Sequence, residues 1–458
     1  MRCGRFALVA LLVVVGLASS LIAPGAAYAQ ANNNGVIVDA QGVLRVQQYA
    51  DPGGMLIRQQ IAAARAALAP EITRSSNLRC VSITRLEKEI QARGGIVTDD
   101  MRYLAGLTRI KYVFYFPETK DIVIAGPAEG WVQTQSGRVR GMQSGHPIVQ
   151  LQDLIVALRA YSPQGKSVGM IGCSIDPTPE GLAAMQQFLK VAYQRAQPSQ
   201  AFANYVVQGL KTSLGLQNVR VDGISPRTHF AQVMVEADYR MKLIGIGIEQ
   251  APAGIGSYVG RANPSQVSRN AMERWYFVPN YECVRVTQDL SAMELVGDGV
   301  RLISENEMVN AAGQRAASGQ VNRASEAFVS TFTKKYPELA KASPVYGELR
   351  NVIDMAIAAA YIQKANLYQK AGWNMDFFGE EAKFSVETYE LPKTVETACT
   401  AIWKGNQLMT PVGGGVEIRA SKALDSENLL EDENGLVAKK RQDLKLELAE
   451  GQWWWDAR

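Results

Sequence analysis

The clearest structural signal in the chain is the stretch KYVFYFPETKDIVIAG, residues 111–126. Both ends of this stretch, residues 112–116 and 122–124, consist of aromatic and β-branched side chains, which favour β-strands. The residues between them, 117–121, include proline and aspartate and therefore suit a turn. We expect a strand–turn–strand unit here.

On the N-terminal side of this unit the pattern is first helical. Apolar residues recur at helical spacing over residues 54–69, and Pro70 then stops the pattern. Residues 78–84 have the composition of a strand, and the charged residues 85–92 favour a further helix. Residues 30–50 are expected to form an exposed lead-in.

On the C-terminal side, helices and strands alternate. A helix is expected over residues 151–160 and a strand over residues 167–175. Thr178 is a suitable N-cap and Pro179 suits a first helical position, so another helix begins there. A further helix is expected over residues 201–214.

Residues 230–244 fit two structures, because their apolar residues match both a helical face and strand alternation. We prefer the helix because of its length. Farther along, four short strands are expected, and Gly297-Asp298-Gly299 is predicted to join the last two as a tight hairpin. These strands are residues 275–278, 283–287, 293–296 and 300–304.

From residue 322 the chain becomes helical, and residues 355–362 are apolar on nearly all sides. That helix is therefore expected at the centre of a core. After residue 376 no pattern dominates. The charged residues 425–458 end in three tryptophans, which fit either a partner-binding end or a strand packed on the body.

Taken together, these patterns predict an α+β fold. It has a mixed α/β N-terminal region, a central helix-plus-antiparallel-sheet region, and a largely helical region before a charged C-terminal tail. The predicted boundaries are 1–29 for a signal peptide, 30–74 for the lead-in and first helix, 75–215 for the N-terminal α/β domain, 216–310 for the central α+β domain, 311–424 for the helical region, and 425–458 for the tail.

The first residues have the three parts of a secretory signal peptide. Arg2 and Arg5 precede an uncharged apolar run, residues 6–23, and an Ala-x-Ala site follows. Cleavage is predicted between Ala29 and Gln30. The alternative is an uncleaved membrane anchor, since the run is at the lower limit for a spanning helix. The signal predicts a secreted or periplasmic protein.

The charge balance is close to neutral. The chain has a formal net charge of +4, and removal of Arg2 and Arg5 with the signal leaves 46 basic against 44 acidic residues. A mixed, near-neutral surface argues against nucleic acid as a partner. No second apolar stretch is long enough to span a bilayer, so we expect no stable membrane insertion after cleavage.

Cysteine usage permits two interpretations. Cys3 leaves with the signal, and an even number of cysteines remains in an exported chain, which suggests disulfides. The other interpretation is a set of buried free thiols. We predict Cys80–Cys173, because both residues lie in strand-like segments of one region, and Cys283–Cys399 mainly by elimination.

Several catalytic and cofactor chemistries lack the residues they need. The only histidines, His146 and His229, are too few for most metal hydrolases, and neither is expected to act as a catalytic base. The glycine-rich residues 254–260 have one residue too many for a dinucleotide-binding loop, and residues 413–415 lack the Lys-Ser/Thr that follows a phosphate loop, so both are interpreted as turns. The acidic residues 431–435 lack the ligands of a calcium loop. We expect no metal and no cofactor, and the catalytic residues, if any, are unknown.

The densest polar cluster consists of Glu236, Asp238, Arg240 and Lys242. On a helix these residues form two acid–base pairs at i,i+4 spacing on nearly opposite faces, so that one pair could face inward. On a strand all four would share one face. Either arrangement could orient a ligand. The alternative is a set of ion pairs that only stabilise the fold.

Five segments taken together resemble a family of exported planctomycete proteins catalogued only as a domain of unknown function. The resemblance covers about residues 75–420. It implies export and one recurring architecture, but no activity and no catalytic residue. The segments are YVFYF with AGPAEGW (residues 112–116 and 125–131), CSIDPT (173–178), ADYRMK (237–242) and RWYFVP (274–279).

The sequence therefore favours an exported, non-enzymatic protein that binds an unknown protein or a component of the cell envelope. The alternative is an exported hydrolase of unfamiliar design that uses carboxylates instead of histidine. Two carboxylates about 5–10 Å apart in a cleft would support the hydrolase.

Overall fold

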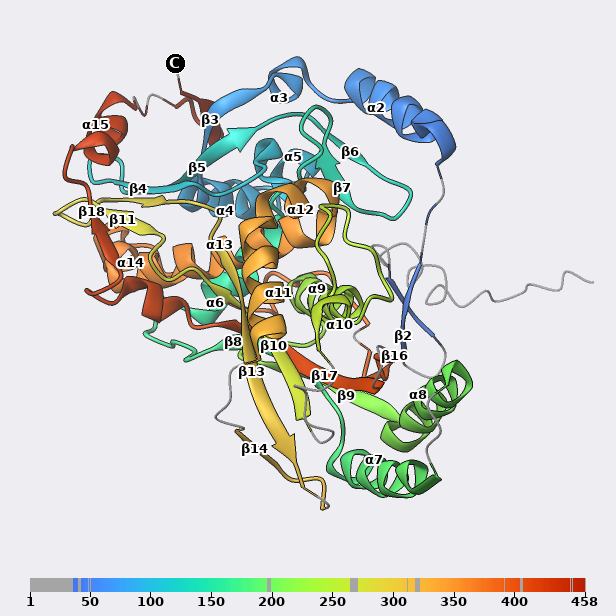
Figure 1. Ribbon diagram of the computed structural model, residues 1–458. Coiled ribbons are helices and arrows are strands. Elements are labelled where there is room, and N and C mark those ends of the chain that lie inside the picture. Colours follow the sequence, from blue (N-terminus) through green and yellow to red (C-terminus); the bar gives the residue numbers. More distant parts are fainter. Residues whose placement is uncertain are drawn as a thin grey trace, which may run out of the picture.

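The computed structural model describes residues 36–457, except 40–42, 48, 50, 196–198, 264–270, 311, 318–321, 391, 404–406, 445 and 447. The predicted signal peptide and its cleavage site, Ala29 and Gln30, lie outside the described residues. Within them the α+β class is confirmed, since helices and two mixed sheets pack together (Figure 1).

The larger sheet has ten strands among the described residues and draws them from distant parts of the chain. Parallel and antiparallel neighbours both occur in it. Its strand order is β1 (Val36–Val38), β2 (Val43–Val46), β15 (Thr394–Glu396), β9 (Leu216–Asp222), β8 (Ile171–Asp176), β17 (Gln407–Ile418), β10 (Ala271–Pro279), β13 (Val300–Val309) and β14 (Arg315–Ala317), with β16 (Cys399–Trp403) paired to β17.

The smaller sheet has seven strands in the described part of the chain and contains the strand–turn–strand unit predicted from residues 111–126. Its order is β18 (Leu429–Glu431), β11 (Val284–Val286), β12 (Ala292–Leu295), β4 (Tyr112–Phe116), β5 (Asp121–Ala128), β3 (Ser76–Ser82) and β19 (Trp454–Asp456). A separate pair is formed by β6 (Trp131–Gln133) and β7 (Val139–Gly141).

The long helices of the interior are α6 (Leu151–Ala160), α9 (His229–Gly245) and α13 (Pro344–Lys364). The helical prediction for residues 230–244 is confirmed, and α13 is buried on nearly all sides, as its composition indicates. The other helices are α2 (Met55–Ala67), α3 (Pro70–Thr73), α4 (Ile83–Ala92), α5 (Asp99–Arg102), α7 (Pro179–Ala192), α8 (Gln200–Leu214), α10 (Tyr258–Arg261), α11 (Arg323–Lys334), α12 (Tyr336–Ala342), α14 (Leu367–Ala371) and α15 (Leu436–Asp443).

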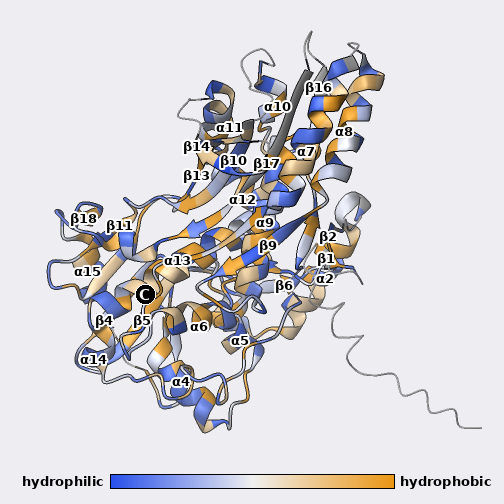
Figure 2. Ribbon diagram, turned by 90° about the horizontal axis from the view of Figure 1, so that it is seen from below, coloured by the Kyte–Doolittle hydropathy of each residue, from blue (hydrophilic) through white to orange (hydrophobic). Residues whose placement is uncertain are grey.

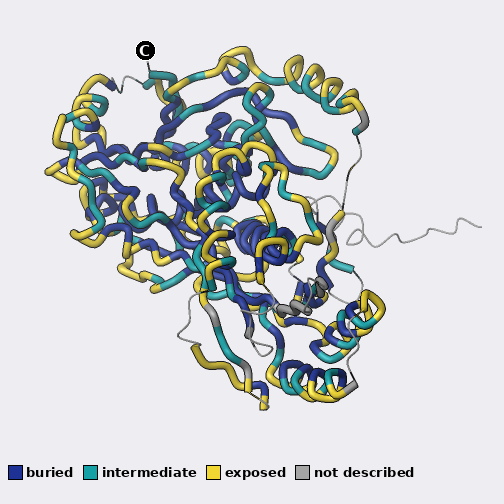
Figure 3. Tube along the Cα trace, in the orientation of Figure 1, coloured by how far each residue is buried: buried dark blue, intermediate teal, exposed yellow. Residues whose placement is uncertain are grey.

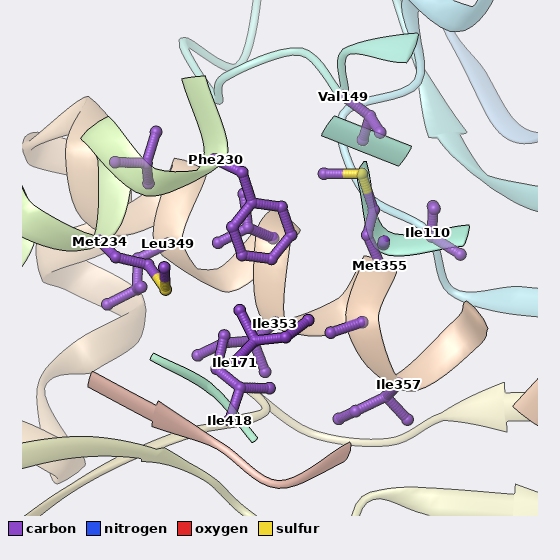
Figure 4. Close-up of a cluster of buried hydrophobic side chains, with 14 of the residues drawn as sticks. Ile110, Val149, Ile171, Phe230, Met234, Leu349, Ile353, Met355, Ile357 and Ile418 are labelled. Atoms are coloured by element: carbon purple, nitrogen blue, oxygen red, sulfur yellow. The ribbon is translucent and has the colours of Figure 1, made fainter. Parts of the chain in front are cut away.

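One hydrophobic core joins both sheets through these helices. Phe230 and Met234 of α9 meet Leu349 and Ile353 of α13 above Ile171 of β8 (Figure 4). Figure 3 shows α9 and α13 as the buried centre of the molecule, with α2 exposed at its edge. Burial of each large apolar side chain here contributes about 1.5–3 kcal/mol to stability.

Helices α7 and α8 form a hairpin at the margin of the larger sheet and pack on each other through a smaller apolar cluster. In Figure 2 both helices carry hydrophobic and hydrophilic residues side by side, as amphipathic helices do. Thr178 caps α7 by accepting a hydrogen bond from the amide of Gly181, with Pro179 in the first turn, as the sequence predicts.

Two turns predicted from glycine are wrong. Strands β12 and β13 do not form a hairpin, because β12 pairs with β4 and β11 in the smaller sheet while β13 pairs with β10 and β14 in the larger one. Residues 297–299 therefore connect two sheets. Residues 413–415 lie inside β17 and not in a turn, since β10 and β8 approach β17 so closely that a Cβ at Gly414 would lie 1.9 Å from a backbone oxygen.

The C-terminal tryptophans are part of the body, which settles the alternatives that the sequence leaves open. Strand β19 pairs with β3 and places the Asp456 carboxylate 2.8 Å from Nε of the fully buried Arg79. The Trp454 ring lies 4.7 Å from the same guanidinium. The guanidinium also donates hydrogen bonds to four backbone carbonyls, those of Glu71, Ile72, Arg74 and Ala105.

The predicted disulfides are absent, because the four cysteines among the described residues are buried free thiols. Cys80 lies in the smaller sheet and Cys173 in the larger one, so the premise of a shared sheet is wrong. The predicted Cys283–Cys399 pair is likewise not formed. Burial raises the pKa of Cys80 and of Cys283 to about 12, which keeps these thiols protonated and unreactive.

Candidate functional site

The charged cluster predicted on residues 236–242 lies on α9, and its two pairs have different surroundings. Asp238 and Lys242 are both fully buried. The Lys242 ammonium donates to Asp238 Oδ2 at 2.7 Å, to the carbonyl of Ile175 at 2.9 Å and to the carbonyl of Gly414 at 3.2 Å. All three protons are used, so Lys242 ties α9 to β8 and β17 instead of facing a ligand.

Burial also shapes the electrostatics of this pair. Removal from water raises the pKa of Asp238 to about 6, although the charge of Lys242 acts in the opposite direction. One carboxylate oxygen of Asp238 has no hydrogen-bond partner among the described groups. The pair is therefore a structural tie that is costly to disturb.

The second pair of the cluster belongs to a buried ionic network. The Glu236 carboxylate contacts Arg138 from the loop that follows β6, and Arg138 also pairs with Glu348 of α13. Arg240 lies 3.6 Å from Glu236 and 2.6 Å from Glu249. The network joins α9 to α13 and to the β6–β7 segment. The structure thus engages all four predicted cluster residues in internal ion pairs.

His229 has a partner that the sequence does not reveal. Its Nδ1 lies 2.7 Å from Asp153 Oδ2, and both side chains are buried. Burial opposes protonation, but the Asp153 carboxylate outweighs it and raises the pKa of His229. His229 Nε2 has no hydrogen-bond partner in the described structure, so no hydroxyl or thiol is held against it. The only signal in the sequence is an aspartate within the largely apolar segment that forms α6.

His146 and Ser144 also fail to form a nucleophile–base pair. The hydroxyl of Ser144 donates to Glu129, whose carboxylate also accepts from the amides of Gln143 and Ser144. His146 contributes its backbone amide to Ser144 Oγ at 3.1 Å. Burial lowers the pKa of His146. Glu129 therefore serves to hold this loop, and the serine is not activated by the histidine.

A cavity of about 830 Å³ lies beside the N-terminal end of α9. Four segments form its walls: α6, the turn at residues 162–166, the connection 223–228 between β9 and α9, and residues 379–388 of a long loop. Exposed residues such as Ser225 and Thr388 line it, so it is open to solvent. We call it the α6–α9 cavity.

The loop that forms the outer wall has no regular structure but is fixed at several points. Arg159 of α6 donates to the carbonyls of Phe378 at 2.7 Å and Phe384 at 2.6 Å, and it also pairs with Glu381. The buried carboxylate of Glu87 accepts from the amides of Phe377 and Phe378. A long irregular loop held in this way is typical of a binding or catalytic element.

The charges at the cavity are unevenly paired. Arg159 and Glu381 neutralise each other. Lys166 and Arg227 also line the cavity and are exposed, and neither takes part in an ion pair within the part of the chain that the structure describes. The cavity therefore holds two unpaired positive charges.

Two other kinds of site are absent from the described residues. No group of three or more histidine, cysteine, aspartate or glutamate side chains is placed to hold a metal ion there. No helix in the described part of the chain is long and apolar enough to cross a membrane.

One family model matches the chain, over residues 173–258, and is described as "Protein of unknown function (DUF1598)". The match supports a domain of unknown function that runs from β8 through α9 to the start of α10. It includes the connection 223–228 at the α6–α9 cavity and the whole charged cluster of α9. No curated protein and no solved structure matches the chain.

Proposed function

We propose that this protein is an exported, non-enzymatic binding protein that takes a small polar ligand in the α6–α9 cavity. The observation that carries the proposal is the cavity itself. Its volume of about 830 Å³ falls within the range of about 300–1,000 Å³ typical of small-molecule sites. Its lining combines apolar groups with hydroxyl and charged groups.

The anchoring of the outer wall supports this interpretation. Arg159 fixes the loop from the side of α6, and Glu87 fixes it from the side of α4. A wall held before binding reduces the entropy lost when the ligand is ordered. The inner wall is equally fixed, because Thr228 caps α9 by accepting from the amide of Ala231.

The arrangement of carboxylates favours binding over hydrolysis. A carboxylate-based hydrolase needs two such groups facing each other across the substrate. Glu381 is the only acid among the residues that line the α6–α9 cavity, and it is paired with Arg159. Outside the cavity, the His229 imidazole is held by Asp153 and the Ser144 hydroxyl by Glu129.

Export is proposed from the sequence of residues 1–29 and from the resemblance to exported proteins. A ligand from the cell envelope would then be within reach of the open cavity. Intact-mass analysis of protein recovered from culture medium or periplasm should give a chain that begins at Gln30. A chain that retains residues 1–29 would make this segment an anchor and contradict the proposal.

A blocked cavity gives the direct test of binding. A library of small polar molecules is screened by ligand-observed NMR against the parent, Thr388→Trp and Thr212→Trp. Thr388 is exposed and lines the cavity, while Thr212 is exposed on α8, away from it. We expect compounds that bind the parent and Thr212→Trp but not Thr388→Trp. Equal binding to all three proteins, or no binding compound at all, would overturn the proposal.

A further inference from the structure

We propose that the α6–α9 cavity selects an anionic ligand, a small molecule with a carboxylate or phosphate group that Lys166 and Arg227 bind. This inference rests on the proposed binding function and adds the charge class of the ligand. Carboxylate and phosphate present the same chemistry to these residues, namely oxygen atoms that carry negative charge and accept hydrogen bonds.

The charges that line the cavity carry the argument. Its lining contains three cations and one acid. Arg159 and Glu381 pair with each other, and Arg159 also donates to two carbonyls of the wall. The charges of Lys166 and Arg227 have no such counterpart among the described residues. A bound anion would supply it.

Elsewhere most enclosed cations of the described structure pair with acids, although the buried Arg350 of α13 forms no ion pair there. Arg79, Arg138 and Lys242 are buried, and each contacts at least one carboxylate. The half-buried Arg274 pairs with two acids, Asp176 and Glu307. Lys166 and Arg227 are exposed and lack an ion pair among the described residues, as Lys190 does, but unlike Lys190 they line the cavity, where a ligand can reach them.

Both cations stand on backbone that is fixed, whereas their side chains are free. The carbonyl of Lys166 accepts from the amide of Ser162 at 3.0 Å and from the Gln363 side chain at 2.8 Å. The carbonyl of Arg227 accepts from the amide of Tyr389 at 3.0 Å. The two residues come from different walls of the cavity, so an anion between those walls would be held from two sides.

The N-terminal end of α9 adds to the same field. Thr228, the N-cap of this helix, lines the cavity, and the N-terminus of a helix carries partial positive charge. Hydroxyl groups of Ser162 and Ser225 are further polar groups of the lining. These features assist an anion, but the unpaired cations are what select for it.

Matched sugars test the charge class directly. Isothermal titration calorimetry compares glucuronate, glucose 6-phosphate, glucose and glucosamine at low and at physiological ionic strength. We expect both acidic sugars to bind at least tenfold more tightly than glucose, with an affinity that falls as salt is added. The acidic sugar that binds more tightly shows whether the cavity prefers a carboxylate or a phosphate group.

Single substitutions locate the effect. Arg227→Gln and Lys166→Gln should each weaken binding of the tighter-binding acidic sugar about two- to fivefold, as expected for loss of one exposed charged contact. The controls are Arg301→Gln and Lys190→Gln, which remove exposed cations outside the cavity and should leave the affinity unchanged.

Three results would overturn the inference: glucose or glucosamine binding as tightly as the acidic sugars, no binding of either acidic sugar, or full affinity in the Lys166→Gln/Arg227→Gln double variant. Failure of the binding function itself gives a different pattern. If glucose binds the parent and Thr212→Trp but not Thr388→Trp, the cavity is a binding site without charge selection. If Thr388→Trp binds every ligand of the parent, the cavity is not the site at all.

Discussion

Helix α9 and the cavity at its N-terminal end use charge in opposite ways. On α9, the ammonium of Lys242 donates to three acceptors in the protein interior, and the residue has no exposed surface. At the cavity, Lys166 and Arg227 are exposed, and the described residues offer them no ion-pair partner. A dense run of charges along a sequence therefore indicates a structural role when each charge is satisfied internally. A ligand can bind charged groups that are exposed and have no internal partner, whether or not they are close together in the sequence.

The largest effect is expected inside α9, from Lys242→Met. The substitution leaves the Asp238 carboxylate buried without its cation, which should lower the free energy of unfolding by about 3–5 kcal/mol. Burial raises the pKa of Asp238 to about 6 even with Lys242 present. A buried carboxyl of this kind destabilises the native state as the pH rises from the unfolded pKa of about 3.9 to the folded pKa. Removal of Lys242 should raise the folded pKa of Asp238 further, so the stability lost in Lys242→Met should shrink in acid, where Asp238 takes up a proton. Urea denaturation at pH 5 and at pH 8 measures the loss of stability and its dependence on pH.

A double variant supplies the control for this prediction. Asp238→Leu/Lys242→Met removes both charges and keeps a similar volume, so it should recover most of the stability lost in Lys242→Met. If Lys242→Met unfolds at the same urea concentration as the parent, the buried Asp238–Lys242 pair does not stabilise the fold.

Much of the local structure follows from the sequence, and long-range pairing does not. The unit at residues 111–126 follows from turn chemistry between two strand-like segments, and α9 follows from the length of its apolar pattern, because the periodicity there also fits a strand. Two strand-like segments flank residues 297–299, and this local pattern predicts a hairpin. The partners of those strands lie in different sheets, and no local pattern reports that.

The candidate site is hidden from the sequence for the same reason. Its walls come from four segments between residues 156 and 388, and the outer wall lies where no pattern dominates. Along the sequence, Lys166 and Arg227 look like ordinary surface cations. The cluster at residues 236–242 is conspicuous because its charges are adjacent, yet its partners, Arg138 and the carbonyls of β8 and β17, are remote in sequence.

A smaller effect is expected where the two regions meet, at the His229–Asp153 pair. Asp153→Asn should lower the free energy of unfolding by about 2 kcal/mol at pH 5.5, as for the loss of a hydrogen bond to a charged group. The Asp153 carboxylate raises the pKa of His229, so the stability it provides is complete below about 6.5, the ordinary histidine pKa. That stability is lost as the pH rises through the folded value.

Other groups around His229 do not provide this dependence. Tyr389 packs on the imidazole ring, while Glu348 and Arg138 act on it with opposite sign. Urea denaturation of the parent and of Asp153→Asn is compared from pH 5.5 to 8.5. The difference between their free energies of unfolding should become smaller as the pH rises. His229→Asn should remove most of this narrowing. A difference that is constant with pH would mean that His229 is not protonated in the folded protein.

At the cavity wall, Arg159→Ala should lower the free energy of unfolding by about 1–2 kcal/mol. The reason is that the side chain donates to two carbonyls of the loop and pairs with Glu381. Its main consequence should be local. Hydrogen exchange at residues 376–389 should accelerate while exchange in α9 stays unchanged. Arg93→Ala removes an exposed ion pair with Glu89 and serves as the control. It should change hydrogen exchange neither in the loop nor in α9. Unchanged exchange of the loop in Arg159→Ala would show that other contacts fix the wall.

The smallest effect on stability is expected for Lys166→Gln and Arg227→Gln, and this prediction separates the two regions most sharply. Both side chains are exposed, and neither forms an ion pair within the described structure, so each substitution should change the free energy of unfolding by less than about 0.5 kcal/mol. Urea denaturation without ligand measures this value, with Lys190→Gln as the control. A loss comparable to that of Lys242→Met would mean that these cations also stabilise the fold, and the distinction between satisfied and available charge would fail. A negligible loss would show that the fold does not need these two charges, which leaves them free for a ligand.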